Sequence, residues 1–179
     1  MGLVGTLAPE IGNLSFLVSL NASENSFHGP IPPSIFNMSF LEVLEVRNNS
    51  LSSSLPLDMC IHNLHRLKRL RLSYNEMYGE IPSSLEKCSQ LEYLSLVNNT
   101  FSGFVPREIG NLTKLQILYL GVNKLTDDAG MLGAAWLGYF WLATEAPRRG
   151  DDDRRRRKRR QSEEAVATAT GIDRPETRE

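Results

Sequence analysis

The chain has 179 residues, of which 41% are hydrophobic and 23% are charged, and its formal net charge is −1. A chain of this length usually forms one domain, and the near-zero net charge excludes a global electrostatic attraction to nucleic acid or to an acidic substrate. The composition is uneven, however. Residues 1–125 contain twelve asparagines and sixteen serines, whereas residues 126–179 contain no asparagine and only Ser162. This change predicts a domain boundary near residue 126.

The beginning of the chain, residues 1–6, lacks the basic start and the long apolar run of a secretory signal. These residues match the loose myristoylation pattern Met-Gly-x-x-x-Ser/Thr. They also match the second half of a sequence repeat that recurs later in the chain, and we favour this second interpretation. Because the first half of that repeat is absent, we expect the sequence to be a fragment that opens in mid-repeat.

A repeated phrase organises the residues up to 125. Five copies of the approximate form L-x-x-L-x-L-x-x-N follow one another, and their final asparagines are 24, 26, 24 and 24 residues apart. A period of this size is typical of a stacked-repeat solenoid. Within each copy, alternating apolar and polar residues predict a half-buried strand whose leucines face the core. The five asparagines are Asn25, Asn49, Asn75, Asn99 and Asn123.

These asparagines have a structural explanation. Each strand is expected to end in a sharp turn that leaves backbone N–H and C=O groups without partners, at a cost of about 1–3 kcal/mol each. A carboxamide group offers two donor hydrogens and an acceptor oxygen, so a column of asparagines can pair with successive turns. We therefore predict a structural asparagine ladder and assign the column no binding role.

The second half of each repeat contains a bend and then a proline, as in Gly79-x-Ile81-Pro82. Glycine allows the tight bend, and proline favours an extended segment, after which we expect a short helical or 3₁₀ turn. The repeat of 26 residues carries two extra residues around 60–63, which we place in a bulge on the convex side. Cys60 and Cys88 occupy non-equivalent positions in their repeats, and this offset argues against a disulfide between them.

The complete phrase, L-x-x-L-x-x-L-x-L-x-x-N-x-L-x-G-x-I-P, resembles the plant-specific class of leucine-rich repeats. That class occurs in the ectodomains of plant receptor-like kinases and receptor-like proteins, and in secreted polygalacturonase inhibitors. The resemblance covers residues 2–125, and the wording of residues 7–20 and 81–96 is most similar to the immune-receptor subfamily that contains the flagellin and elongation-factor receptors. It implies an α/β fold over residues 1–126, a right-handed solenoid with a parallel β-sheet on its concave face.

The repeat pattern ends after residue 126. Residues 127–146 include an uncharged stretch at 129–144 that is shorter than the roughly 20 residues of a membrane-spanning helix. We expect this apolar segment to pack on the end of the solenoid or to fray from it, and a stop-transfer span is the alternative. Residues 147–179 are highly charged and predict a disordered tail. The basic run at 154–160 also fits a nuclear-import or RNA-binding patch, but acidic residues balance basic ones over 126–179, so we expect no nucleic-acid partner.

The outward positions of the predicted strands form a continuous concave surface. Its mixture of charged and aromatic residues favours an extended peptide or a protein surface as the ligand, because tyrosine and arginine often dominate binding energy. The resemblance implies the same kind of partner, together with a co-receptor of the same repeat class. The candidate ligand-binding residues are Arg47, Arg69, Arg71, Tyr93 and Tyr119.

Enzymatic activity is not expected. The three histidines, His28, His62 and His65, are not spaced with a carboxylate, serine or cysteine in a catalytic pattern, and we expect neither a metal nor a cofactor. The resemblance implies a recognition module on the extracellular side of the plasma membrane, with a role in defence signalling. Two alternatives stay open, namely a secreted inhibitor of a cell-wall hydrolase and a non-functional truncated receptor fragment.

Six Asn-x-Ser/Thr sequons precede residue 126 and none follows it, which fits an extracellular origin. The candidate N-glycosylation sites are Asn13, Asn21, Asn37, Asn48, Asn98 and Asn111.

Overall fold

The computed structural model describes residues 2–126 and the strand at residues 141–143. The chain divides into two units, Met1–Thr144 and Glu145–Glu179, and all described residues belong to the first. The apolar stretch at 129–144 therefore lies mostly outside the described residues, and the charged tail at 147–179 lies wholly outside them. The interpretations of both segments remain predictions.

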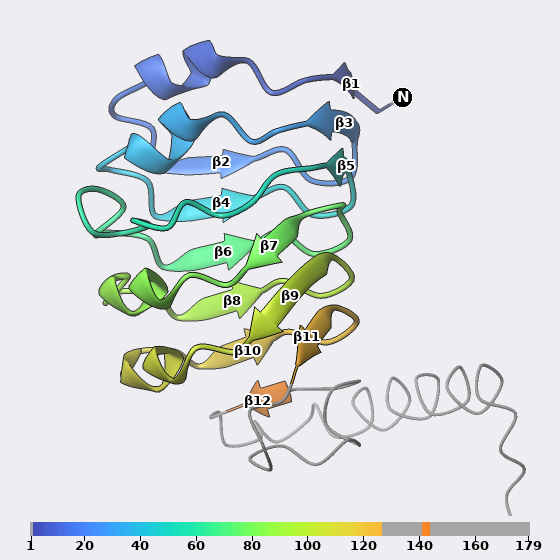
Figure 1. Cartoon of the computed structure of the whole chain (residues 1–179). Helices are drawn as coiled ribbons and strands as arrows, with labels where there is room; N and C mark the ends of the chain where they lie inside the picture. The colour runs from blue at the N-terminus through green and yellow to red at the C-terminus, as the bar shows by residue number, and fades with distance from the viewer. Residues whose placement is uncertain (1, 127–140, 144–179) are drawn as a thin grey trace, which may run out of the picture. The chain divides into compact units, whose positions relative to one another are not determined.

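Each sequence repeat forms one turn of a coil, and the turns stack on one another (Figure 1). The leucine-rich half of every turn contributes a three-residue strand to one sheet, which we call the concave sheet. Its strands pair in parallel except at one edge, where β12 pairs antiparallel with β10. This topology confirms the predicted leucine-rich-repeat solenoid. In spatial order the strands are β2 (Ser19–Asn21), β4 (Val43–Glu45), β6 (Arg69–Arg71), β8 (Tyr93–Ser95), β10 (Ile117–Tyr119) and β12 (Trp141–Ala143).

A second row of short strands, the lateral strands, follows the turn after the asparagine. They pair in parallel in two groups of three, and backbone bonds from Glu76 N to Leu51 O (2.9 Å) and from Tyr78 N to Ser53 O (3.1 Å) connect the groups. The first group is β1 (Val4–Gly5), β3 (Ser26–Gly29) and β5 (Ser50–Leu51), and the second is β7 (Tyr78–Glu80), β9 (Thr100–Phe104) and β11 (Lys124–Thr126).

The five asparagines lie between the concave strands and the lateral strands, where they form a chain of hydrogen bonds through the stack. Asn75 is representative: its Nδ2 donates to the carbonyl oxygens of Val46, Leu72 and Ser73, and its Oδ1 accepts from the N–H of Leu51. Asn49, Asn99 and Asn123 repeat this pattern. Each carboxamide thus joins its own turn to the turn before it.

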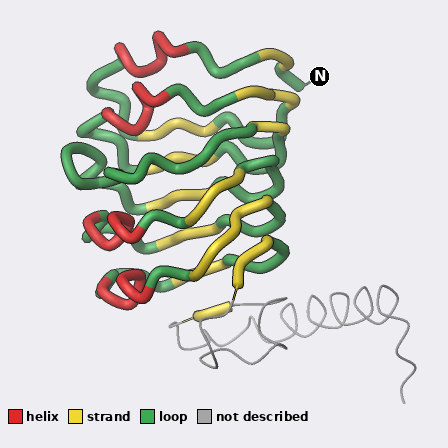
Figure 2. Tube along the Cα trace, viewed as in Figure 1, coloured by secondary structure: helices red, strands yellow, loops and turns green. Residues whose placement is uncertain are grey.

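Short 3₁₀ helices form the side of the coil opposite the asparagines (Figure 2). Each follows or begins with a proline, whose fixed φ suits the first turn of a helix and whose missing N–H would have had no partner there. The structure confirms the predicted 3₁₀ turns in four repeats, but the 26-residue repeat has turns at this place instead. The four helices are η1 (Pro9–Asn13), η2 (Pro33–Asn37), η3 (Ser83–Lys87) and η4 (Arg107–Asn111).

The core is a column of leucines between the two rows of strands. Leu44, Leu70 and Leu94 stand at the strand centres and are fully buried. Burial of such a side chain is worth about 1.5–3 kcal/mol, and it is achieved only because neighbouring turns cover each other. Leu20 is only partly buried, since its strand β2 pairs on one side alone, with β4.

The sequence-based expectation for the cysteines was wrong, because Cys60 and Cys88 form a disulfide. Their Cα atoms are 5.1 Å apart across two neighbouring repeats. Cys60 lies four residues after the proline of its repeat, Pro56, whereas Cys88 lies six residues after Pro82. However, the loop folds back at Cys60, where φ is +62°, and so brings the side chain against the next turn. A comparison of sequence offsets alone cannot detect such a loop.

The residue before each ladder asparagine adopts the left-handed backbone conformation, with φ between +54° and +60°. This conformation costs most L-residues about 1–2 kcal/mol, and asparagine tolerates it best after glycine. Asn48 and Asn98 fit this preference, whereas Val122 is a β-branched residue with a φ of +55°. The five positions are Glu24, Asn48, Tyr74, Asn98 and Val122.

We expect the substitution Val122→Asn to raise the free energy of unfolding by about 1 kcal/mol, because it relieves this backbone strain. Val122 is 56% exposed, so the loss of buried apolar surface is small. Urea unfolding followed by circular dichroism measures the change. The reverse exchange at the equivalent position, Asn98→Val, should destabilise the protein by a similar amount, and equal stability of all three proteins would contradict the explanation.

Candidate ligand-binding face

The outward side chains of the concave sheet form aligned columns. Arg69 pairs in register with Tyr93, and Arg71 pairs in register with Ser95, which in turn pairs with Tyr119. Four of the predicted ligand-binding residues therefore lie on three adjacent strands, β6, β8 and β10. The periodicity of the repeat positions them, since residues at equivalent places in successive turns must be neighbours.

A carboxylate lies beneath the two arginines. Glu45, on the adjacent strand β4, is only 7% exposed and contacts both Arg71 Nη1 at 3.4 Å and Arg69 Nη1 at 3.6 Å. The amide of Asn21 also donates to it at 3.4 Å. Because two guanidinium groups share a single carboxylate, this part of the face retains one positive charge.

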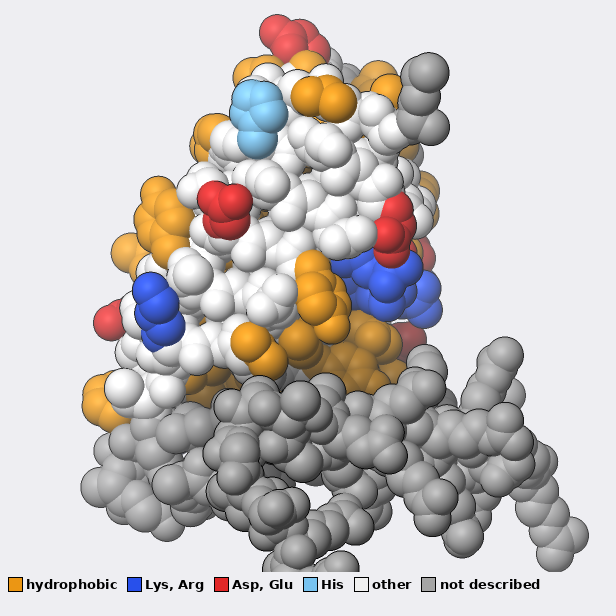
Figure 3. Space-filling view, turned by 90° about the vertical axis from the view of Figure 1, so that its right-hand side faces the viewer, with side chains coloured by type: hydrophobic (Ala, Val, Ile, Leu, Met, Phe, Trp, Pro, Cys, Tyr) orange, Lys and Arg blue, Asp and Glu red, His pale blue; other side chains and the backbone are white. Residues whose placement is uncertain are grey.

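The arginines also contact an aromatic pair. The guanidinium carbon of Arg71 lies 5.1 Å from the centre of the Tyr93 ring, and that of Arg69 lies 5.9 Å away, which are cation–π distances. Tyr93 meets Tyr119 edge to face, with ring centres 5.9 Å apart. We call Glu45, Arg69, Arg71, Tyr93 and Tyr119 the arginine–tyrosine cluster. Figure 3 shows basic side chains grouped beside hydrophobic ones along the right-hand edge of the molecule.

The environment of Tyr93 keeps its hydroxyl neutral. Burial raises the pKa of Tyr93 above its ordinary value, and the nearby Arg71 acts in the opposite direction without cancelling the effect. A tyrosine hydroxyl is neutral at pH 7 even without this shift, so that of Tyr93 can donate a hydrogen bond at neutral and mildly acidic pH. Between Arg71 and Tyr119 the sheet presents Ser95, a small buried residue whose hydroxyl bonds to that of Ser73.

Arg47 has a different environment from the other predicted residues. It forms an ion pair with Glu24 at 2.7 Å, in the loop region beyond the concave strands. Asn48 donates a 2.7 Å hydrogen bond to the same carboxylate. The charge of Arg47 is thus matched by an exposed partner, whereas Arg69 and Arg71 share the single carboxylate of Glu45. Sequence reasoning missed the role of Glu45, although its place in the same column as Arg71 was visible.

The six sequon asparagines are all exposed, so each is accessible for modification. Three make side-chain hydrogen bonds, and among these Asn111 donates to Glu86 at 2.6 Å. This bond is the main reason that the pKa of Glu86 lies below its ordinary value. Asn21 belongs to the concave face itself, so a glycan at Asn21 would cover the margin of the arginine–tyrosine cluster. Glycosylation remains a prediction.

The histidines are exposed, and the ring of His65 bonds to the carbonyl oxygen of His62 at 2.9 Å. Within residues 2–126, no three His, Cys, Asp or Glu side chains are grouped so that they could hold a metal ion. Nor does the described part of the chain contain a helix long and apolar enough to cross a bilayer.

A family model for the leucine-rich repeat region matches residues 8–132, which is more than half of the chain. The chain belongs to the leucine-rich-repeat family. No curated protein matches the sequence significantly. The repeat periodicity, the parallel sheet and the family match therefore agree.

Several solved leucine-rich-repeat structures resemble this chain. The ectodomain of the Arabidopsis thaliana membrane receptor kinase GASSHO1/SCHENGEN3, in complex with CASPARIAN STRIP INTEGRITY FACTOR 2, is 38% identical with a TM-score of 0.67 over 71% of this chain. The Arabidopsis receptor kinase HAESA, in complex with the peptide hormone IDA and the co-receptor SERK1, is 34% identical with a TM-score of 0.67 over 70% of this chain. The expected resemblance to plant receptor ectodomains is confirmed.

The leucine-rich-repeat chain spans only a small share of these relatives, 15% of the first and 21% of the second. A plant ice-binding protein is also similar, at 32% identity and a TM-score of 0.64 over 69% of this chain and 39% of that protein. The same repeat thus supports different functions, so the function of this chain must be argued from its surface residues.

Proposed function

We propose that this chain is a recognition module that binds an extended peptide or a protein segment on its concave sheet. The observation that carries the proposal is the arginine–tyrosine cluster, which combines a surplus positive charge with two aromatic rings on three adjacent strands. Arginine and tyrosine are the residue types most often found at binding hot spots. The two receptor ectodomains described above were solved in complex with a factor or a peptide hormone, which supports this class of ligand.

The charges of the cluster define the chemistry of the ligand. With Glu45 already shared by Arg69 and Arg71, a second carboxylate supplied by the ligand would balance the remaining charge. The exposed parts of Tyr93 and Tyr119 suit an apolar or aromatic side chain next to it. We therefore propose a peptide that presents an acidic group beside an apolar residue.

Alanine substitution at Arg71 or Tyr93 tests this proposal. A panel of synthetic peptides about twelve residues long, with acidic, neutral or basic residues flanking an apolar one, is screened by calorimetry. Either substitution should lower the affinity for the best-binding acidic peptide by tenfold or more, which corresponds to a loss of binding free energy on the order of 1.4 kcal/mol or above. Lys124→Ala, which removes an exposed charge from β11 on the lateral row, is the matched control. Unchanged affinity in both cluster variants would refute the proposed site.

The cellular setting is part of the same proposal. We infer an extracellular location, with a co-receptor of the same repeat class as a second partner and with defence signalling as the process. The Cys60–Cys88 disulfide supports an oxidising compartment. The alternative, a secreted inhibitor of a cell-wall hydrolase, predicts that the purified chain lowers the activity of a polygalacturonase, whereas a peptide receptor would leave that activity unchanged.

A further inference from the structure

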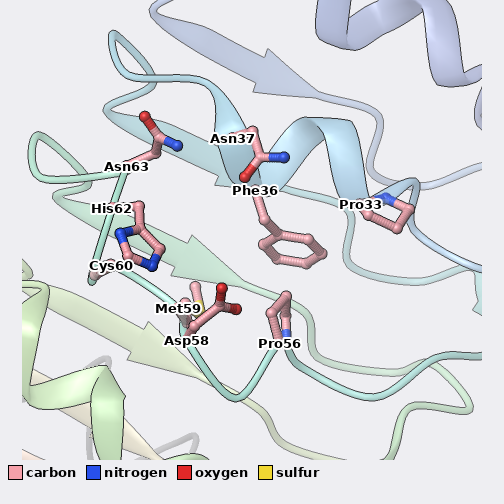
Figure 4. Close-up of a pocket in the computed structure, with 9 residues that line it drawn as sticks. All are labelled: Pro33, Phe36, Asn37, Pro56, Asp58, Met59, Cys60, His62 and Asn63. Carbon is pink, nitrogen blue, oxygen red and sulfur yellow. The ribbon is translucent and has the colours of Figure 1, made fainter.

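A small cavity opens on the convex side, away from the concave sheet, at the 26-residue repeat. Its volume is about 190 Å³. It lies between η2 and the loop at residues 56–63, and Figure 4 shows the Phe36 ring and the Asp58 carboxylate directed into the same space. The other lining residues are Pro33, Asn37, Pro56, Met59, Cys60, His62 and Asn63.

The cavity exists because the helix stack is interrupted here. Elsewhere, η1 packs on η2 and η3 packs on η4, whereas the 26-residue repeat has a wider loop in place of a 3₁₀ helix. This loop carries the two extra residues of the repeat and lines the cavity opposite η2. No equivalent space is available between η1 and η2, where Gly12 lies so close to Ser34 that an added Cβ would come within 2.3 Å of it.

One wall of the cavity is tied to its surroundings by covalent and hydrogen bonds. The disulfide ties Cys60 to Cys88 in the next turn, and Leu64 closes the loop with a fully buried side chain. Two consecutive turns, from Met59 N to Pro56 O (3.2 Å) and from Ile61 N to Asp58 O (3.0 Å), fix the segment between them. A cavity with walls fixed in this way needs little reordering when a ligand enters.

The floor of the cavity is apolar, and its rim is polar, with the Asp58 carboxylate beside His62, Asn37 and Asn63. Phe36 and Met59 are buried beside the proline rings of Pro33 and Pro56. Asp58 is exposed on the rim, and no ion pair between described residues involves it. An apolar floor beside an exposed carboxylate complements a side chain with an apolar stem and a cationic head.

We propose that this cavity binds one lysine or arginine side chain presented by a protein partner on the convex surface. The methylene groups would pack against Phe36, Pro56 and Met59, and the cationic head would pair with Asp58. The volume is below the roughly 300–1,000 Å³ of a typical small-molecule pocket, which fits a single side chain. The interaction is independent of the arginine–tyrosine cluster, because it uses a different surface.

The test uses nuclear magnetic resonance of the full, ¹⁵N-labelled chain, with the disulfide formed and without glycans, since Asn37 lines the cavity. The probes are n-butylguanidinium, neutral n-butanol and anionic n-pentanoate at fixed ionic strength. We expect n-butylguanidinium to shift the amide signals of residues 36–37 and 58–63, with a dissociation constant on the order of 1–10 mM. The two other probes should produce much weaker shifts at the same concentration.

One variant and two controls distinguish the contribution of the carboxylate. Asp58→Asn keeps the size of the side chain, removes its charge and should weaken n-butylguanidinium binding about two- to fivefold, as for a partly exposed ion pair. Glu76→Gln, which removes an exposed charge beside the lateral strands, and Arg71→Ala should leave the shifts unchanged. Equal shifts with n-butanol, no effect of Asp58→Asn, or no localised shifts with n-butylguanidinium would each overturn the proposal.

Discussion

Replacing Asn99 by leucine is expected to lower the free energy of unfolding by about 3–5 kcal/mol, the largest effect that we foresee for a single substitution. The carboxamide of Asn99 donates to the carbonyl oxygens of Leu72, Leu96 and Val97 at 3.0–3.3 Å and accepts from the N–H of Met77 at 3.0 Å. Leucine has a similar size but supplies none of these bonds. Buried backbone groups would then lose their partners, at about 1–3 kcal/mol each.

Asn25 provides the matched control, because it occupies the same position in the first complete repeat. Its Nδ2 donates only to Ala22 and Ser23 of its own turn, and its bond with the N–H of Leu3 is exposed. Water can replace such bonds, so Asn25→Leu should cost about 1–2 kcal/mol. Urea unfolding followed by far-ultraviolet circular dichroism gives the free energy of unfolding of both variants. An equal loss in the two variants would show that burial within the stack does not determine the effect.

Removal of the disulfide is the second large expected effect. Cys60 and Cys88 are 28 residues apart, and cross-linking a loop of this length restricts the unfolded chain by an amount worth about 3–4 kcal/mol. We expect the double variant Cys60→Ala, Cys88→Ala to lose stability of this order. Alanine is preferred to serine because both positions are buried and a hydroxyl there would need a partner.

Dithiothreitol supplies an independent measurement of the same quantity. Reduction should lower the midpoint of urea unfolding of the natural protein and should leave the double variant unaffected. If the reduced natural protein were as stable as the oxidised protein, the disulfide would not contribute to the stability of the fold. Reduction also frees one wall of the convex cavity, because the disulfide at Cys60 holds the loop that forms this wall.

The repeat architecture could be predicted because its information is local and repeated. The spacing of Asn25, Asn49 and Asn75 gives the period, and the leucines before each asparagine give the buried face. In a solenoid each turn contacts mainly its neighbours, so a correct description of one repeat extends to the next. The alignment of Arg69 with Tyr93 followed from the same argument, because a parallel sheet places equivalent residues side by side.

The features that were missed depend on departures from the repeat. The disulfide requires the loop reversal at Cys60, which is created by residues that have no counterpart in the other turns. The burial of Glu45 depends on how Arg69 and Arg71 fold over it from the next strand. A comparison of equivalent positions in the repeats does not reveal these side-chain conformations. The strained backbone at Val122 was likewise hidden, since valine itself gives no signal of a left-handed conformation.

The two extra residues of the 26-residue repeat leave the concave sheet unchanged. Val43 pairs with Arg69 across 26 residues in the same way that Ser19 pairs with Val43 across 24. An insertion in the convex loop is therefore absorbed where it occurs and does not shift the register of the concave strands. This fold can therefore change the length of its convex loops while the register of its concave sheet stays the same, so the two surfaces can vary independently.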